Sequence, residues 1–303
     1  MSRARLVIAS VVATAGAAAA DPLVVAFPDL APPPARPSLA ATADVVRISN
    51  GDRVDGTSAS LRLRPAWESR RARVWLDVGA VAWRDHGRLI ADHALRGTSM
   101  TNPALGGEVW TAPGTARGYL RLAVMAPRVA AATDQPAGPV LAPDDTSTDR
   151  PGPSQQARID ELAFERPTTA YYAAAAGLRV DLPRVVAQAE VGLDLILPTD
   201  VNHQHGPLYW LGLGLAAPVT PRVAAYGRAV ARLARAGDLG DRDAGVEVGA
   251  GAVVAVGPGR LTAGLATRAD AGAINATATE GWGPSVASTT VVRLVVGYAV
   301  PLR

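Results

Sequence analysis

The chain has 303 residues, no cysteine, 30 basic residues that are all arginine, 27 acidic residues and a formal net charge of +3. The absence of cysteine excludes a disulfide framework, a thiolate metal site and a cysteine nucleophile. The small basic surplus gives no support for binding to a nucleic acid, which needs a clustered basic face.

The first 20 residues have the order of a secretory signal peptide. Arg3 and Arg5 precede an apolar, small-residue stretch that ends in Ala18-Ala19-Ala20, just before Asp21. This stretch is too short and too weakly hydrophobic for a spanning helix, so we expect cleavage after residue 20 and export of the chain. Residues 21–42 follow as a Pro- and Ala-rich periplasmic lead-in, which has neither helical nor strand periodicity.

From residue 43 onward, apolar and polar side chains alternate with a period of two, which places them on opposite faces of β-strands. In 185–197, Val, Ala and Leu share one face, whereas Gln188, Glu190 and Asp194 share the other. We expect about twelve strands, several of them about 10 residues long, the length that crosses a bilayer when tilted. The expected strands are 43–48, 58–67, 73–83, 108–112, 118–126, 168–182, 185–197, 208–217, 223–234, 246–256, 260–269 and 288–302.

The expected connections alternate between short turns and long links, as they do in outer-membrane barrels. The short turns are 68–71, 113–117, 183–184, 218–221 and 257–259, and the long links are 49–57, 84–107, 127–167, 198–207, 235–243 and 270–287. Such barrels usually have an even strand number. The two shortest strands, 43–48 and 108–112, give the weakest signal, so ten strands is the alternative count.

Alternation alone is compatible with a soluble, exported β-sandwich as well as with a membrane barrel. A soluble barrel fills its core with large apolar side chains. In this chain the non-apolar faces carry Gly, Ala and charges, and the apolar faces are almost free of charge, which favours a wet lumen and a lipid-facing exterior. We therefore expect an all-β fold, a transmembrane antiparallel up-and-down β-barrel over 43–303. Its long external loop at 127–167 is either functional or disordered.

The last strand carries a terminal pattern in which Gly297 is followed at three and five residues by Val300 and Leu302. It resembles the terminal strand signature of bacterial outer-membrane β-barrel proteins, although aromatic side chains are usual at the last two positions and Arg303 follows here. The resemblance implies insertion into outer-membrane lipid by the barrel-assembly machinery, and it names no particular family. Aromatic side chains that would form partial interfacial girdles are Trp67, Trp83, Tyr172 and Tyr209.

Sorting the charged side chains by face predicts an Arg-rich lumen. The arginines expected inside are Arg62, Arg64, Arg73, Arg121, Arg179, Arg228, Arg232, Arg260, Arg268 and Arg293. The acids expected inside are Asp77, Asp181, Glu190, Asp194 and Glu247. Because rings of arginine attract anions, we expect a passive, porin-like pore for small solutes with an anion preference. The alternative is a non-conducting structural or surface-interaction barrel whose charges pair across the lumen.

All four histidines lie in expected links, so none falls in an expected strand. Asp200, His203 and His205 are close enough in sequence for a weak divalent-metal site, although solvated loop residues are the simpler interpretation. Outer-membrane phospholipases use Ser and His on the barrel surface, which the histidine positions argue against. Asp85 and His86, facing the Asp200 group, loosely resemble the external rim of omptin-type proteases without a matching motif. We expect no enzymatic activity and no cofactor.

Overall fold

A computed structural model gives the fold, and it describes residues 37–50, 53–69, 71–90, 93–127, 169–198, 207–236, 241–271 and 289–302. No helix in these ranges is long and apolar enough to span a membrane. The signal peptide expected at 1–20, most of the expected lead-in and nearly all of the 127–167 loop lie outside the described residues.

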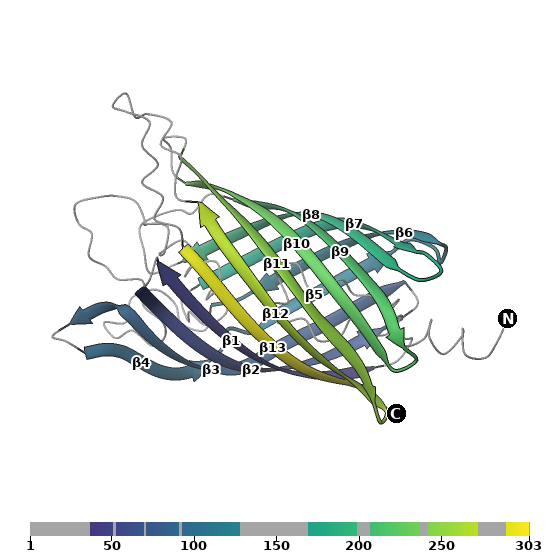
Figure 1. The fold of residues 1–303 in the computed structure, drawn as a ribbon, viewed down its shortest axis with the longest axis horizontal. Helices are drawn as coiled ribbons and strands as arrows, with labels where there is room; N and C mark the ends of the chain where they lie inside the picture. Colours follow the sequence, from purple (N-terminus) through teal and green to yellow (C-terminus); the bar gives the residue numbers. More distant parts are fainter. Residues whose placement is uncertain are drawn as a thin grey trace.

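The described residues form thirteen β-strands (Figure 1). They are β1 (Ser38–Asn50), β2 (Arg53–Glu68), β3 (Ala72–Ile90), β4 (His93–Met100), β5 (Ala104–Trp110), β6 (Ala116–Met125), β7 (Thr169–Asp181), β8 (Val186–Pro198), β9 (Leu208–Thr220), β10 (Val223–Ala236), β11 (Asp241–Val256), β12 (Gly259–Ala271) and β13 (Thr289–Pro301).

Antiparallel pairing closes these strands into a barrel. β13 pairs with β1, β1 with β2, and β2 with β3, so the two ends of the sheet meet. β4 and β5 share one position, because β3 pairs with β5 over 72–77 and with β4 from Ala80 onward. The barrel therefore has twelve strand positions, and the expected twelve-stranded transmembrane β-barrel is confirmed. Both strands with the weakest sequence signal, at 43–48 and 108–112, belong to it as β1 and β5.

Three of the expected long links consist largely of strand. In the link expected at 235–243, β10 reaches Ala236 and β11 begins at Asp241. β1 reaches Asn50 and β2 begins at Arg53, within the link expected at 49–57. Most of the link expected at 84–107 belongs to β3, β4 and β5, so the placement of His86 and His93 outside strands is wrong. The reason is that backbone pairing needs no apolar alternation, so a hairpin can continue through polar sequence beyond the apolar belt.

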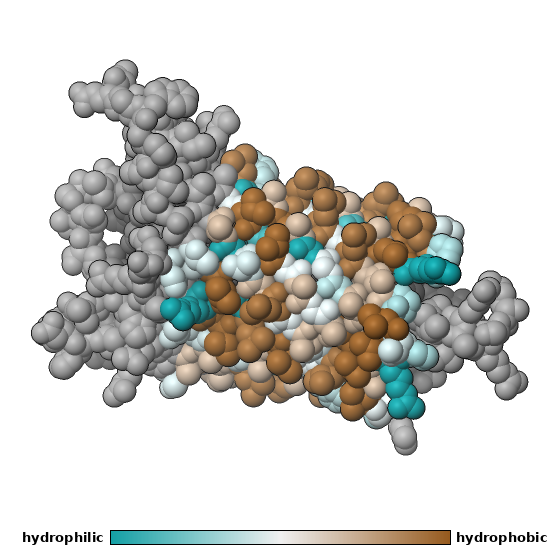
Figure 2. Space-filling view, in the orientation of Figure 1, coloured by the Kyte–Doolittle hydropathy of each residue, from teal (hydrophilic) through white to brown (hydrophobic). Residues whose placement is uncertain are grey.

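The two faces of the barrel differ sharply in polarity. On β12, Leu265 is 54% exposed on the outside, whereas its neighbours Gly264 and Ala266 are buried on the inside. Figure 2 shows hydrophobic side chains over the visible outer face of the barrel. Soluble proteins rarely expose contiguous apolar patches of more than a few hundred Å². Leucines are exposed on the outside of the closed barrel and charged side chains are buried inside it, which is the distribution expected for a membrane barrel. The soluble β-sandwich alternative is therefore wrong.

Five short turns lie at the same end of the barrel as the C-terminus (Figure 1). They join β2 to β3, β5 to β6, β7 to β8, β9 to β10 and β11 to β12, as the sequence predicts. In the last of them Gly257 has a φ of +57° and precedes Pro258. A positive φ at the first central residue is what a two-residue hairpin turn of the primed type requires.

Candidate functional site

The inner wall of the barrel carries the charged side chains. All ten arginines expected inside face inward; nine are buried, and Arg260 is half-buried. Of the five expected acids, Asp77, Glu190, Asp194 and Glu247 are buried, and Asp181 is half-buried near the short turns. The period of two therefore places these side chains in the lumen as expected.

Four further charged residues of the inner wall were missed by the sequence analysis. They are Asp44, Glu68, Glu108 and Arg117, all of them buried. Glu68 and Arg117 stand at strand ends that were assigned to turns, and the other two belong to the weak strands β1 and β5. The sequence contains one signal for Glu108. Pairing the β5–β6 hairpin places Glu108 directly opposite Arg121, and this indicates that the two side chains share a face. Counting the four, the described inner wall carries eleven arginines and eight acids.

Four inward carboxylates each contact two arginines, and this grouping recurs around the wall. The groups are Asp44 with Arg62 (3.4 Å) and Arg293 (3.7 Å), Glu108 with Arg121 (3.2 Å) and Arg73 (3.9 Å), Asp181 with Arg179 (2.7 Å) and Arg117 (3.4 Å), and Glu247 with Arg232 (3.1 Å) and Arg228. We call them the paired-arginine groups. Each joins side chains on the same or adjacent strand positions, so it braces the wall.

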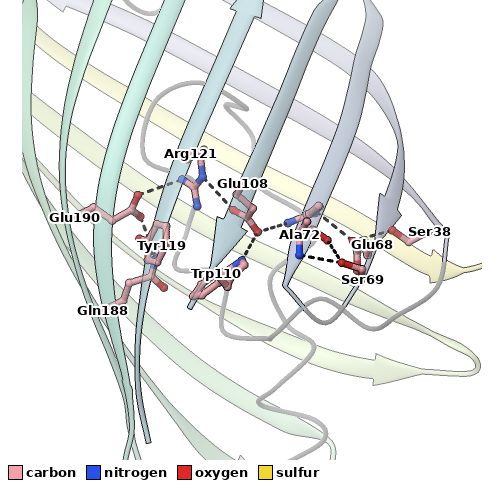
Figure 3. A network of polar contacts seen from close by, with 11 residues as sticks. Ser38, Glu68, Ser69, Ala72, Glu108, Trp110, Tyr119, Arg121, Gln188 and Glu190 are labelled. Carbon is pink, nitrogen blue, oxygen red and sulfur yellow. Dashed lines mark hydrogen bonds and ion pairs between the residues drawn. The ribbon is translucent and has the colours of Figure 1, made fainter. Parts of the chain in front are cut away.

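The polar contacts are continuous over one half of the barrel, as Figure 3 shows. The network runs from Ser38 on β1 through Glu68, Arg73, Glu108, Arg121 and Glu190 to Gln188 on β8. Arg121 contacts Glu190 two strand positions away at 3.2 Å. A network of charge-assisted hydrogen bonds holds its members in fixed positions. These side chains are therefore held along the wall.

Inward aromatic rings lie over glycines on the adjacent strand. The directly opposite pairs are Trp75 with Gly106, Tyr119 with Gly177, Trp210 with Gly192, and Tyr226 with Gly251. A Cβ atom on any of these glycines would lie 2.1–2.3 Å from the nearest atom of the aromatic side chain. The pairing of an aromatic ring with a cross-strand glycine pins strand register. The inward glycines thus make room for specific rings, a reason the sequence analysis did not identify.

The structure also gives the positions of most residues predicted to act in assembly or in the interfacial girdles. Gly297 is buried on the inner side of β13, Val300 is half-buried, and Leu302 is exposed just after that strand. Trp67 lies outside near the short turns, and Tyr172 and Tyr209 lie outside at the opposite ends of their strands. The side chain of Trp83 is outside the described set.

The weak metal site predicted at Asp200, His203 and His205 lies outside the described residues. Within the described ranges no group of three or more His, Cys, Asp or Glu side chains is arranged to hold a metal ion.

The fold is similar to those of solved outer-membrane proteins. An outer membrane channel from Pseudomonas putida F1 has a TM-score of 0.57 at 10% identity, over 93% of this chain and 98% of that chain. The β domain of the Bordetella autotransporter BrkA has a TM-score of 0.45 at 17% identity, over 88% and 100% of the two chains. The KdgM porin has a TM-score of 0.40 at 5% identity, over 86% and 99%.

No protein-family model matches the sequence, and no curated protein matches it. The likeness to the Pseudomonas channel concerns the fold. The chain has the architecture of a bacterial outer-membrane β-barrel.

Proposed function

We propose that the protein is a passive pore for small solutes in the bacterial outer membrane, with a preference for anions. The observation that carries the proposal is the surplus of arginine on the described inner wall, which carries eleven arginines and eight acids. Rings of arginine in a pore attract anions and repel cations. A net positive inner wall therefore supports a preference for anions.

The sequence supports the route by which the barrel would reach its membrane. The segment 1–20 would direct export, and the barrel-assembly machinery would read Gly297, Val300 and Leu302 at the end of the chain. The exposed leucines and valines of the strands would then contact outer-membrane lipid. As a passive pore, the chain would need no catalytic residue, no cofactor and no nucleic acid.

The experiment is conductance of the purified barrel in planar lipid bilayers, with the reversal potential measured under a KCl gradient. The wild type should give discrete conductance steps and a reversal potential displaced from zero towards the equilibrium potential of chloride. Changing Arg228, Arg232 and Arg293 to Gln should move the reversal potential towards that of potassium. The matched control is Arg64→Gln with Asp77→Asn, which removes a buried pair at 3.0 Å without changing the net charge.

Heat-modifiable gel mobility establishes that each variant is folded before its conductance is recorded. A cation-selective wild type would contradict the proposal. So would a triple variant with unchanged selectivity, or a control that shifts as far as the triple variant.

A second candidate function is a non-conducting structural barrel. The observation in its favour is the burial of inward charged side chains, of which Asp194 is 0% and Arg179 1% exposed. Charges so shielded from water are compatible with a lumen closed by its own side chains. Folded barrel that inserts into bilayers and carries no current would favour this second function over the first.

A further inference from the structure

The outer face of the barrel carries an exposed arginine near its external end. Because the short turns mark the periplasmic end, β1 ends and β4 begins at the external end. Arg47 lies three residues before the end of β1, and its side chain is exposed on the outer face, next to the inward, buried Val46. A charged side chain at this position lies where the apolar belt ends and the lipid head groups begin.

Strand register places two further arginines in the same cross-strand row. Arg47 is directly opposite Thr57 of β2. Thr57 is opposite Arg84 of β3, and Arg84 is opposite Arg96 of β4. Directly opposite residues share a face of the sheet, so these positions belong to the outer face. We call Arg47, Arg84 and Arg96 the arginine row. With neighbouring strands about 4.8 Å apart, the row extends over about 14 Å.

The arginine row concentrates like charge. Arg84 and Arg96 are directly opposite each other, and like charges at such positions destabilise a sheet. By the alternation of the described strands, acidic residues occupy inward positions, apart from Asp55 at the register shift between β1 and β2. The carboxylates of the ion pairs therefore lie on the other side of the barrel wall. An anion from outside the chain would stabilise the row.

Exposed apolar side chains lie next to the row on the same face. Val45, two residues before Arg47, is 48% exposed, and it is directly opposite Leu294 of β13, which is exposed as well. Two residues along a strand correspond to about 7 Å. The outer face thus offers an accessible apolar surface and, about 7 Å closer to the external end, positive charge. A molecule with acyl chains and an anionic head group matches both.

We propose that the arginine row binds a lipid of the external leaflet whose head group carries two phosphates. Arg84 and Arg96 are neighbours, whereas Arg47 lies two strands from Arg84, about 10 Å away, so the row has two separate positive sites. Each site binds one phosphate, and the acyl chains pack on Val45 and Leu294. Arginine suits phosphate because its N–H donors bind in pairs, and basic clusters at a membrane surface recognise anionic head groups. This inference concerns the outside of the barrel and does not depend on conductance.

The probes are lipid A with both phosphates and the same lipid A after enzymatic removal of the phosphates. Native mass spectrometry of the folded barrel in detergent counts the lipids bound at each lipid concentration. One arginine at an anionic surface corresponds to about fivefold in affinity, and three correspond to on the order of 100-fold. The lipid with both phosphates should therefore bind on the order of 100-fold more tightly than the phosphate-free lipid. Equal binding of the two lipids would overturn the proposal.

The variants separate the row from positive charge in general. Arg47→Gln should weaken binding of the lipid with both phosphates about fivefold, and adding Arg84→Gln and Arg96→Gln should weaken it on the order of 100-fold. The matched control removes the same charge at the periplasmic end, by changing to Gln the three exposed short-turn residues Arg71, Arg184 and Arg222. The control should bind the lipid as the wild type does. Equal weakening in the two triple variants would overturn the proposal.

The number of bound lipids gives a second measure that is independent of affinity. Arg235 and Arg242 are another directly opposite pair, on β10 and β11, so the barrel can hold lipid elsewhere on its surface. The triple variant of the row should therefore bind one lipid fewer than the short-turn control, with both variants shown to be folded by heat-modifiable gel mobility. An equal number of lipids on the two variants would overturn the proposal, whether or not the barrel conducts.

Discussion

Replacing Gly192 by alanine should destabilise the barrel, because the new methyl group would overlap the ring of Trp210. The two residues are directly opposite on β8 and β9, and the added Cβ would lie 2.1 Å from Cζ2 and 2.2 Å from Cε2 of the ring. The ring is buried against Val230, so it has little room to move away. Alanine in place of glycine within a strand gains about 0.5–1 kcal/mol. Overpacking costs about 1–3 kcal/mol, and an overlap with a rigid ring belongs near the upper limit.

The net expectation is a loss of about 2 kcal/mol in the free energy of unfolding. The assay is urea unfolding of the barrel in lipid vesicles, followed by gel mobility. Gly227→Ala on β10 is the matched control, because the nearest atom to its added Cβ is 3.8 Å away. That variant should be unchanged or more stable by up to about 1 kcal/mol. Equal midpoints for the two alanine variants would refute the reasoning.

Three other changes test separate parts of the structure. Leu265→Arg places a charge on the lipid-facing side of β12 and should lower the free energy of unfolding by about 2–4 kcal/mol, whereas Leu182→Arg in a short turn should cost about 0–1 kcal/mol. Equal costs would argue against an apolar belt. Glu247→Gln removes the carboxylate that two arginines contact, so we expect a loss of about 3–5 kcal/mol in urea unfolding; an unchanged midpoint would mean that this group does not brace the wall. Deleting residues 300–303 should reduce the yield of heat-modifiable barrel in the envelope fraction, and an unchanged yield would contradict the assembly role of the terminal residues.

Much of the barrel could be predicted from the sequence because strand alternation has a period of two and the exterior must be apolar. In β11, the alternation of Val246 and Val248 with Glu247 predicts that the valines face outward and the glutamate inward. The structure confirms this assignment. The same logic placed the ten arginines inside. It failed where polar hairpins continue past the apolar belt, as at His86 in β3 and His93 in β4.

The grouping of the charges could not be predicted, because it depends on register and on closure. Asp44 contacts Arg293 only because the first and last strands are neighbours in the closed sheet. From the sequence alone, Gly192 is interpreted only as a small residue in a narrow lumen. Its specific role, to make room for the ring of Trp210, becomes visible only when β8 is paired with β9. Neither relation is local in the sequence, so alternation alone contains no signal for it.

The central claim, that the chain is a barrel embedded in the outer membrane, is tested most directly by the gel mobility of the envelope fraction. Closed barrels that bury their backbone hydrogen bonds resist unfolding, so the detergent-extracted protein should migrate differently before and after boiling. A heat-dependent shift of outer-membrane material is the predicted result. Recovery of the protein in the soluble periplasm, with no shift on heating, would contradict the account.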